Sequence, residues 1–433
     1  MMDMQAIFAV IIAVLTYAAI LSGKVHKTVA ALLGGCAMVL LRVVGEEEAF
    51  QAIDLGVIFL LTGMMVISHF LAKSGFFGYV AIRIAQLAKG RPLPLLVLLC
   101  TVTGLLSALV DNVTTIVLIA PVTFLVAEQL EVNPVPYLLF EVMAANVGGT
   151  ATLIGDPPNI LIGSKAGLTF NQFLINLGPI VLVCLALLVG AAAFAVRKSA
   201  HVSSDIRARI MEMNPAGAIS DRRLMLKSLF GLSLVLTSFL LHGLLHIGPA
   251  PAALAGAALL LLFTHAEPSE AFGAVEWPTL FFFVGLFLTV AGLAATGVLD
   301  QIARFAVSLT GSDLFLTAMV VLWFAAITSA FIGAIPIVTA LIPVVQNIIP
   351  GITAQGTLPE PVVAQALWWS LALGACLGGN GTVFGTAANV VVVEIARNNR
   401  REISFAQFLR YGLPVTFVTL VLSSIYVLIR YVP

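Results

Sequence analysis

The sequence predicts an all-α polytopic membrane protein with two inverted-topology repeats, each with about five membrane crossings plus a re-entrant helical hairpin, and with discontinuous transmembrane helices. Three observations support this fold class: the composition, an internal repeat and the distribution of basic residues. Hydrophobic residues make up 60% of the chain and charged residues 10%, whereas soluble domains have about 25% charged residues. The net charge is zero, so the composition implies no nucleic-acid partner.

The internal repeat is clearest in a glycine-rich segment. Residues 145–159 (ANVGGTATLIGDPPN) correspond to residues 375–389 (ACLGGNGTVFGTAAN), so that Asn159 matches Asn389 at a spacing of 230 residues. Segments nearer the N-terminus correspond at a spacing of 222, and an extra loop at 351–361 accounts for the difference. Paired Gly/Pro interruptions in corresponding halves indicate the binding site of a secondary transporter.

Apolar runs of about 20 residues mark the expected crossings. In the first repeat, residues 1–196, we expect spans near 5–22, 28–43, 55–73, 135–163 and 172–196, with a non-crossing hairpin over 92–128. In the inverted second repeat, residues 225–433, we expect spans near 225–247, 251–265, 277–296, 361–396 and 411–430, with a hairpin over 313–350. The segments 135–163 and 361–396 are predicted to be broken helices. An odd number of crossings per half gives the halves opposite orientations.

The basic residues set the expected orientation. Sixteen fall on the side that includes the linker 197–224, and four fall on the other side. Basic residues concentrate in cytoplasmic loops, so we expect a cytoplasmic linker, both termini outside, and a location in a bacterial or archaeal inner (plasma) membrane. The first hairpin then opens from the cytoplasm and the second from outside.

The turn of the first hairpin contains Asp111, followed by Asn112, Thr114 and Thr115. A carboxylate at bilayer depth is costly and is a functional hypothesis by default. An Asp at this position is also a good N-cap for the helix that follows. Both interpretations stay open, because a helix N-terminus near the midplane can itself bind a ligand.

The first helix break contains Asp156-Pro157-Pro158. Prolines remove backbone donors and end a helix, and the freed carbonyl groups need partners. One proline is enough for a kink, whereas this break accumulates more polar side chains than a kink requires: Asn146, Thr150, Thr152, Asp156 and Asn159.

The two halves differ in charge. Asp111 aligns with Gly333 and Asp156 aligns with Thr386, so we expect the coupling proton or cation to bind in the first half. Glu141 is either a proton-relay carboxylate or a residue near the cytoplasmic interface, and we include it with Asp111 and Asp156 as a coupling candidate.

The string Asp111–Thr115 (DNVTT), followed by Gly148–Asn159 (GGTATLIGDPPN), resembles the ion transporter superfamily. This group includes arsenite efflux permeases (ArsB), sodium/proton antiporters of the NhaD type, the P protein and carboxylate transporters. The resemblance covers almost the whole chain, is closest to an arsenite/antimonite efflux permease, and implies a homodimer with a scaffold part and a moving transport part. It departs at Gly333–Pro336, which lacks a polar tip, and at Ala387-Ala388, which replaces Pro-Pro.

The resemblance and the polar residues together give a predicted substrate-binding set: Asn112, Thr114, Thr115, Asn146, Gly148, Gly149, Thr150, Thr152, Asn159, Gly378, Gly379, Asn380, Thr382 and Asn389.

We expect a secondary active transporter that exports arsenite or antimonite in exchange for protons. The predicted site has two carboxylates and no evident Arg or Lys beyond the helix ends, which suits a small neutral polyhydroxy species. The alternatives are a Na⁺/H⁺ antiporter and an anion or carboxylate carrier or channel of the same superfamily. No catalytic or metal-binding motif is present in the sequence, so we expect no enzyme activity, no bound metal and no cofactor, with coupling by H⁺ or Na⁺. The expected partners are the lipid bilayer, a small inorganic substrate and a second copy of the chain, and a cytosolic ATPase is a further candidate.

Overall fold

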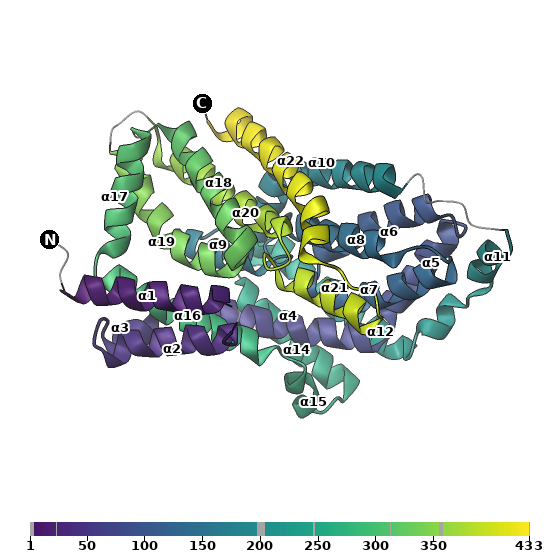
Figure 1. The fold of residues 1–433 in the computed structure, drawn as a ribbon. Coiled ribbons are helices and arrows are strands. Elements are labelled where there is room, and N and C mark those ends of the chain that lie inside the picture. Colours follow the sequence, from purple (N-terminus) through teal and green to yellow (C-terminus); the bar gives the residue numbers. More distant parts are fainter. Residues whose placement is uncertain are drawn as a thin grey trace.

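The computed structural model describes residues 4–22, 24–196, 204–245, 247–311, 313–354 and 358–432 (Figure 1). Within these residues the chain forms only helices and connecting loops, as the sequence predicts. Nine of the described helices are long and apolar enough to cross a bilayer: α4, α7, α10, α12, α16, α18, α19, α20 with the turn after it, and α22. The all-α membrane fold is thus confirmed.

The first half contains ten helices within the described residues: α1 (Met4–Ser22), α2 (Lys27–Leu40), α3 (Glu46–Gln51), α4 (Leu55–Lys73), α5 (Phe76–Leu87), α6 (Pro92–Ser107), α7 (Asn112–Gln129), α8 (Pro134–Gly149), α9 (Pro157–Ala166) and α10 (Phe170–Val196). The second half follows the same order with one additional short helix, α13 (His242–Leu245). Its other elements are α12 (Arg222–Leu240), α14 (Pro249–Thr264), α15 (Pro268–Gly273), α16 (Trp277–Ala295), α17 (Val298–Thr310), α18 (Leu314–Ile332), α19 (Ala334–Thr353), α20 (Glu360–Gly378), the 3₁₀ turn η2 (Gly379–Gly381), α21 (Ala387–Asn398) and α22 (Phe405–Tyr431).

The packing of the helices repeats between the halves. Helix α2 packs against α16 as α14 packs against α4, and α6 packs against α8 as α18 packs against α20. The close approaches correspond as well. A Cβ atom on Gly63 would lie 2.6 Å from the carbonyl carbon of Ala253, and one on Gly285 would lie 2.4 Å from that of Ala31. Glycine at these two crossings lets the helix backbones touch.

The two halves run in opposite directions. Both ends of the chain lie at the left of Figure 1, whereas α11 (Ser204–Glu212), which follows the first half, lies at the right. Each half therefore starts on one side of the molecule and ends on the other.

Six helices, α1, α2, α4, α12, α14 and α16, pack among themselves, and we call them the scaffold group. Helices α6–α10 and α18–α22 pack around α8 and α20, and we call them the core group. Helices α2 and α14 have only 14 and 16 residues. At 1.5 Å per residue each is shorter than the bilayer core of about 30 Å.

The predicted linker 197–224 is partly helical. Residues 197–203 lie outside the described part, whereas α11, the turn η1 (Pro215–Ala218) and the start of α12 at Arg222 fall within it. The backbone N–H of Ser220 donates to the carbonyl oxygen of Ser74 at 3.0 Å, which holds the linker against the first half.

The predicted hairpins appear as two helix pairs with short turns. Helix α6 ends at Ser107, and α7 begins at Asn112 with Asp111 as its N-cap, whose Oδ1 accepts from the Thr114 N–H at 2.8 Å. Helices α18 and α19 are joined by Gly333 alone, at φ 96°. Glycine adopts this conformation without the strain that a side chain would add.

Candidate substrate-binding site

One cavity collects all four interruptions of the fold. It is lined by the turn between α6 and α7, the turn between α18 and α19, and the two helix breaks. These segments come from both halves of the core group, and helices of the scaffold group close the other wall. The lining from the core group includes Asp111, Asn112, Val113, Asp156, Pro157, Pro158, Gly333, Ala334, Ile335, Pro336, Phe384, Thr386 and Ala387.

An amide cluster lies within the core group and joins the two halves. Asn146 Nδ2 donates to Asn380 Oδ1 at 2.8 Å and to Asn389 Oδ1 at 2.9 Å. Asn112 Nδ2 donates to Asn146 Oδ1 at 3.1 Å. All four side chains are buried. The structure thus brings together four predicted site residues from α7, α8, η2 and α21.

Both helix breaks use an asparagine to satisfy the carbonyl groups that the break frees. Asn159 Nδ2 donates to the carbonyl oxygens of Thr150 at 3.1 Å and Thr152 at 2.9 Å. The corresponding Asn389 donates to the carbonyl oxygens of Gly379 at 2.9 Å and Thr382 at 2.8 Å. Unpaired carbonyl groups inside a membrane protein are costly, so these amides stabilise the broken geometry.

Other predicted site residues shape the cavity without lining it. A Cβ atom on Gly148 would lie 1.9 Å from the Gly104 oxygen, and one on Gly378 would lie 2.4 Å from the Ala326 oxygen, so both glycines serve helix packing. Thr152 donates to the Ala108 oxygen in the turn between α6 and α7, and Thr382 donates to the Ala330 oxygen in the last turn of α18. Thr114, Thr115, Gly149, Thr150 and Gly379 are likewise absent from the residues that line this cavity.

The predicted coupling carboxylates lie in different surroundings. Asp156 lines the cavity, is 4% exposed and makes no capping bond, and its Oδ2 has no hydrogen-bond partner among the described residues. Asp111 also lines the cavity, but one of its oxygens caps α7. Asp156 therefore has an oxygen available for a proton, a cation or a ligand donor.

Glu141 lies inside the core group, away from the cavity lining. Its Oε1 accepts from Thr103 Oγ1 at 3.2 Å and from Thr123 Oγ1 at 3.0 Å, so it links α6, α7 and α8. Its Oε2 has no hydrogen-bond partner among the described residues. The side chain is completely buried, which places it in the protein interior and not at an exposed interface.

The sequence did not indicate that helices of the scaffold group line one side of the cavity. Lys27, Glu276 and Thr279 line the same cavity, whereas the charge distribution placed Lys27 among the sixteen basic residues on the side of the linker. One signal was available in the repeat: Glu276 corresponds to Asp54 at the spacing of 222. The approach of Lys27 to the helix breaks is a tertiary relationship that no local pattern indicates.

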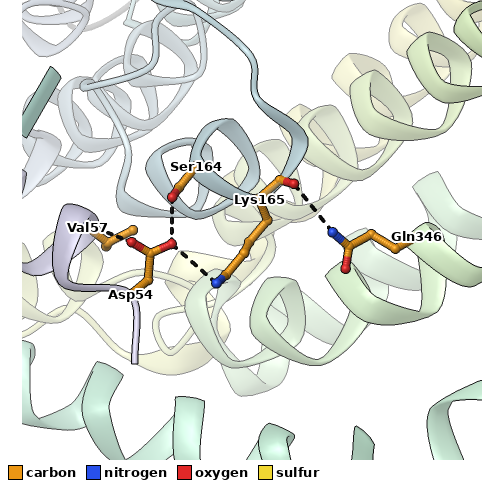
Figure 2. A network of polar contacts seen from close by, with 5 residues as sticks. All are labelled: Asp54, Val57, Ser164, Lys165 and Gln346. Carbon is orange, nitrogen blue, oxygen red and sulfur yellow. Dashed lines mark hydrogen bonds and ion pairs between the residues drawn. The ribbon is translucent and has the colours of Figure 1, made fainter. Parts of the chain in front are cut away.

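A second polar network joins the scaffold group to the core group (Figure 2). Asp54 Oδ2 accepts from Ser164 Oγ at 2.5 Å and lies 3.4 Å from Lys165 Nζ. The other oxygen of Asp54 accepts from the Val57 N–H at 3.1 Å, and the Lys165 carbonyl oxygen accepts from Gln346 Nε2 at 3.4 Å. This network connects α4 with α9 and α19.

Comparisons with known proteins place the chain in a transporter family. A family model described as "Citrate transporter" matches residues 17–374. A 46 kDa membrane protein of Mycobacterium leprae is 42% identical over 431 residues, with 99% of both chains covered. An uncharacterized transporter of Mycobacterium tuberculosis is 45% identical with the same coverage. The human P protein is 30% identical over 99% of this chain and 60% of its own length.

Among solved structures, the YdaH transporter of Alcanivorax borkumensis has the same fold, with a TM-score of 0.58 and 16% identity over 88% of this chain and 86% of that chain. The resemblance to the wider superfamily is supported, including its P protein branch, whereas the finer resemblance to arsenite efflux permeases gains no support. The protein is a multi-pass membrane transporter, and the chain belongs to the citrate transporter family.

Proposed function

We propose that this protein is a secondary transporter that moves a small organic carboxylate anion across the membrane together with a coupling proton or cation. The observation that supports this most directly is the cavity at which both hairpin turns and both helix breaks meet. Interrupted helices at one central site are the usual construction of ion and substrate sites in secondary transporters. The match to the citrate transporter family supports a carboxylate as the substrate class.

The N-terminus of α19 suits an anion. It begins at Ala334 beside the cavity, and no side chain caps it. A helix N-terminus has free N–H groups and a partial positive charge, and it binds carboxylates and phosphates. The corresponding end of α7 is already occupied by the Asp111 carboxylate. The anion therefore binds at the turn of the second half, and the coupling ion binds at the carboxylates of the first half.

Coupling follows from the charges around the cavity. Asp111, Asp156 and Glu276 line the same space as the proposed anion site. Like charges in a partly buried site repel strongly, so an anion binds best after a proton or a cation has neutralised one of these carboxylates. We propose H⁺ or Na⁺ as that ion, with Asp156 as its first site because Asp156 Oδ2 has no partner among the described residues.

We further propose a membrane arrangement for the fold. The α6–α7 and α18–α19 pairs act as re-entrant hairpins. One pair belongs to the first half and the other to the second half, yet the turns of both pairs line the same cavity. The linker side faces the cytoplasm of a bacterial or archaeal cell, as the sixteen basic residues on that side favour. The transporter works as a homodimer.

Transport by purified protein in proteoliposomes tests this proposal. We expect uptake of radiolabelled citrate that depends on an imposed pH or sodium gradient and that stops when the gradient is collapsed. Arsenite uptake driven by a proton gradient, without citrate uptake, would instead support the arsenite or antimonite export predicted from the sequence. A sodium-dependent proton flux without either substrate would support the Na⁺/H⁺ antiporter alternative. Either of these two results would overturn the carboxylate proposal.

A further inference from the structure

We propose that Lys27 binds a carboxylate group of the transported anion and gives the cavity its preference for di- and tricarboxylates. The assignment rests on the proposed function, because it names the residue of the scaffold group that recognises the substrate. Lys27 is the first residue of α2, its side chain is exposed, and it lines the cavity together with Asp156 and Ala334.

The position of Lys27 has an electrostatic cost that a purely structural role does not explain. A cation in the first turn of a helix lies against the positive end of the helix dipole, which is unfavourable. No side chain caps this end of α2, and none of the ion pairs formed by the described residues includes Lys27. The Lys27 ammonium therefore lines the cavity with no carboxylate within ion-pair distance among the described residues.

The aromatic ring of Phe282 holds the lysine head in place. Lys27 Nζ lies 5.5 Å from the centroid of this ring, within cation–π distance. Phe282 is itself buried and lines the same cavity. The contact orients the lysine without neutralising it, which leaves its N–H donors for another partner.

The internal repeat offers a comparison between an acid that contacts the core group and an acid that bonds within its own helix. Asp54 and Glu276 occupy corresponding positions before α4 and α16. Asp54 caps its helix and also contacts Ser164 and Lys165 of α9. Glu276 makes no capping bond, and its Oε2 accepts from Thr279 Oγ1 at 3.2 Å. Glu276 and Lys27 both line the cavity, and Lys27 is its cationic lining residue among those described.

The substrate class follows from two positive elements in different groups of helices. Lys27 belongs to the scaffold group, and the uncapped N-terminus of α19 belongs to the core group. A substrate with two or more carboxylates can contact both, whereas a monocarboxylate can satisfy only one. Bridging the two groups also couples substrate binding to their relative movement.

The test compares four forms of the full-length protein in proteoliposomes: the wild type, Lys27→Gln, Lys27→Arg and Lys24→Gln. Lys24 lies three residues earlier, is exposed and does not line the cavity, so it controls for a general loss of surface charge. Citrate, succinate and acetate are the probes. We expect Lys27→Gln to raise the half-saturation concentration for citrate about ten-fold or more, since a hydrogen bond to a charged group is lost.

Lys27→Arg should restore most of the citrate affinity, Lys24→Gln should behave as the wild type, and the preference for citrate over acetate should fall in Lys27→Gln alone. Calorimetric citrate binding by each purified, folded variant checks the same ranking without transport. An unchanged half-saturation concentration and an unchanged citrate-to-acetate preference in Lys27→Gln would overturn the assignment while the proposed function stands. A wild-type protein that neither binds nor moves any of the three carboxylates would overturn the proposed function and this assignment together.

Discussion

Asn146 in α8 donates a 2.8 Å hydrogen bond to Asn380 in η2, and this contact joins the two broken helices of the repeat at a completely buried position. The residues are 234 positions apart in the chain. They are not repeat equivalents, because Asn380 corresponds to Thr150 at the spacing of 230. The second half therefore supplies an amide that the first half lacks, and the interface between the halves depends on this difference.

Replacing Asn146 with alanine should destabilise the folded protein by about 1–3 kcal/mol, because the Asn380 and Asn389 oxygens would lose a buried donor. The measurement is thermal unfolding in detergent. Asn399→Ala is the control, since Asn399 is exposed and bonds only within its own helix. Equal melting temperatures for the two variants would contradict the importance of the amide cluster.

Local features of the sequence were sufficient for much of the fold. The predicted spans 55–73 and 277–296 agree with α4 and α16, because each apolar run begins directly after an acidic residue, Asp54 and Glu276. The break near Asp156 was also predictable, because Gly155 and the pair Pro157-Pro158 occur together there, whereas single prolines such as Pro121 stay inside a helix.

Tertiary relationships were not predictable in the same way. The sequence grouped Gly148 and Gly378 with the substrate-binding residues, whereas both are required for helix contacts with partners more than 40 residues away. The distribution of basic residues placed Lys27 on the linker side, and only the packing of α2 against α16 brings it to the cavity.

Gly148→Ala should prevent normal folding, because the added methyl group would lie 1.9 Å from a backbone oxygen of Gly104. Backbone atoms cannot move aside as a flexible side chain can, and overpacking of this kind is destabilising. Gly190→Ala is a matched control in helix α10, where a Cβ atom would meet nothing within 4 Å. The yield of monodisperse protein after size-exclusion chromatography reports the difference. A normal yield of Gly148→Ala would show that α6 and α8 can separate.

Asp111→Asn should abolish gradient-driven transport while the protein stays folded. Asn caps helices about as well as Asp, so the bond to the Thr114 N–H can persist while the charge in the cavity is removed. Asp313→Asn is the matched control, because Asp313 caps α18 in the same way, through the Leu316 N–H at 2.7 Å, but is exposed and away from the cavity. Gradient-driven citrate uptake is the measurement, and full uptake by Asp111→Asn would remove this carboxylate from the coupling step.

Lys165→Gln should shift the protein away from the conformation seen here, because the ion pair with Asp54 connects α9 of the core group to α4 of the scaffold group. A partly exposed pair contributes only about 0–1 kcal/mol, so we expect a change in conformational populations and not a loss of folding. Faster maleimide labelling of a cysteine introduced at the buried Val57 of α4, with the exposed Cys36 replaced by serine, would report the opening between α4 and α9. Lys73→Gln is the control, since its ion pair with Glu270 joins α4 to α15 and not to a helix of the core group. If both variants label at the same rate, the Asp54–Lys165 contact does not influence the position of the core group.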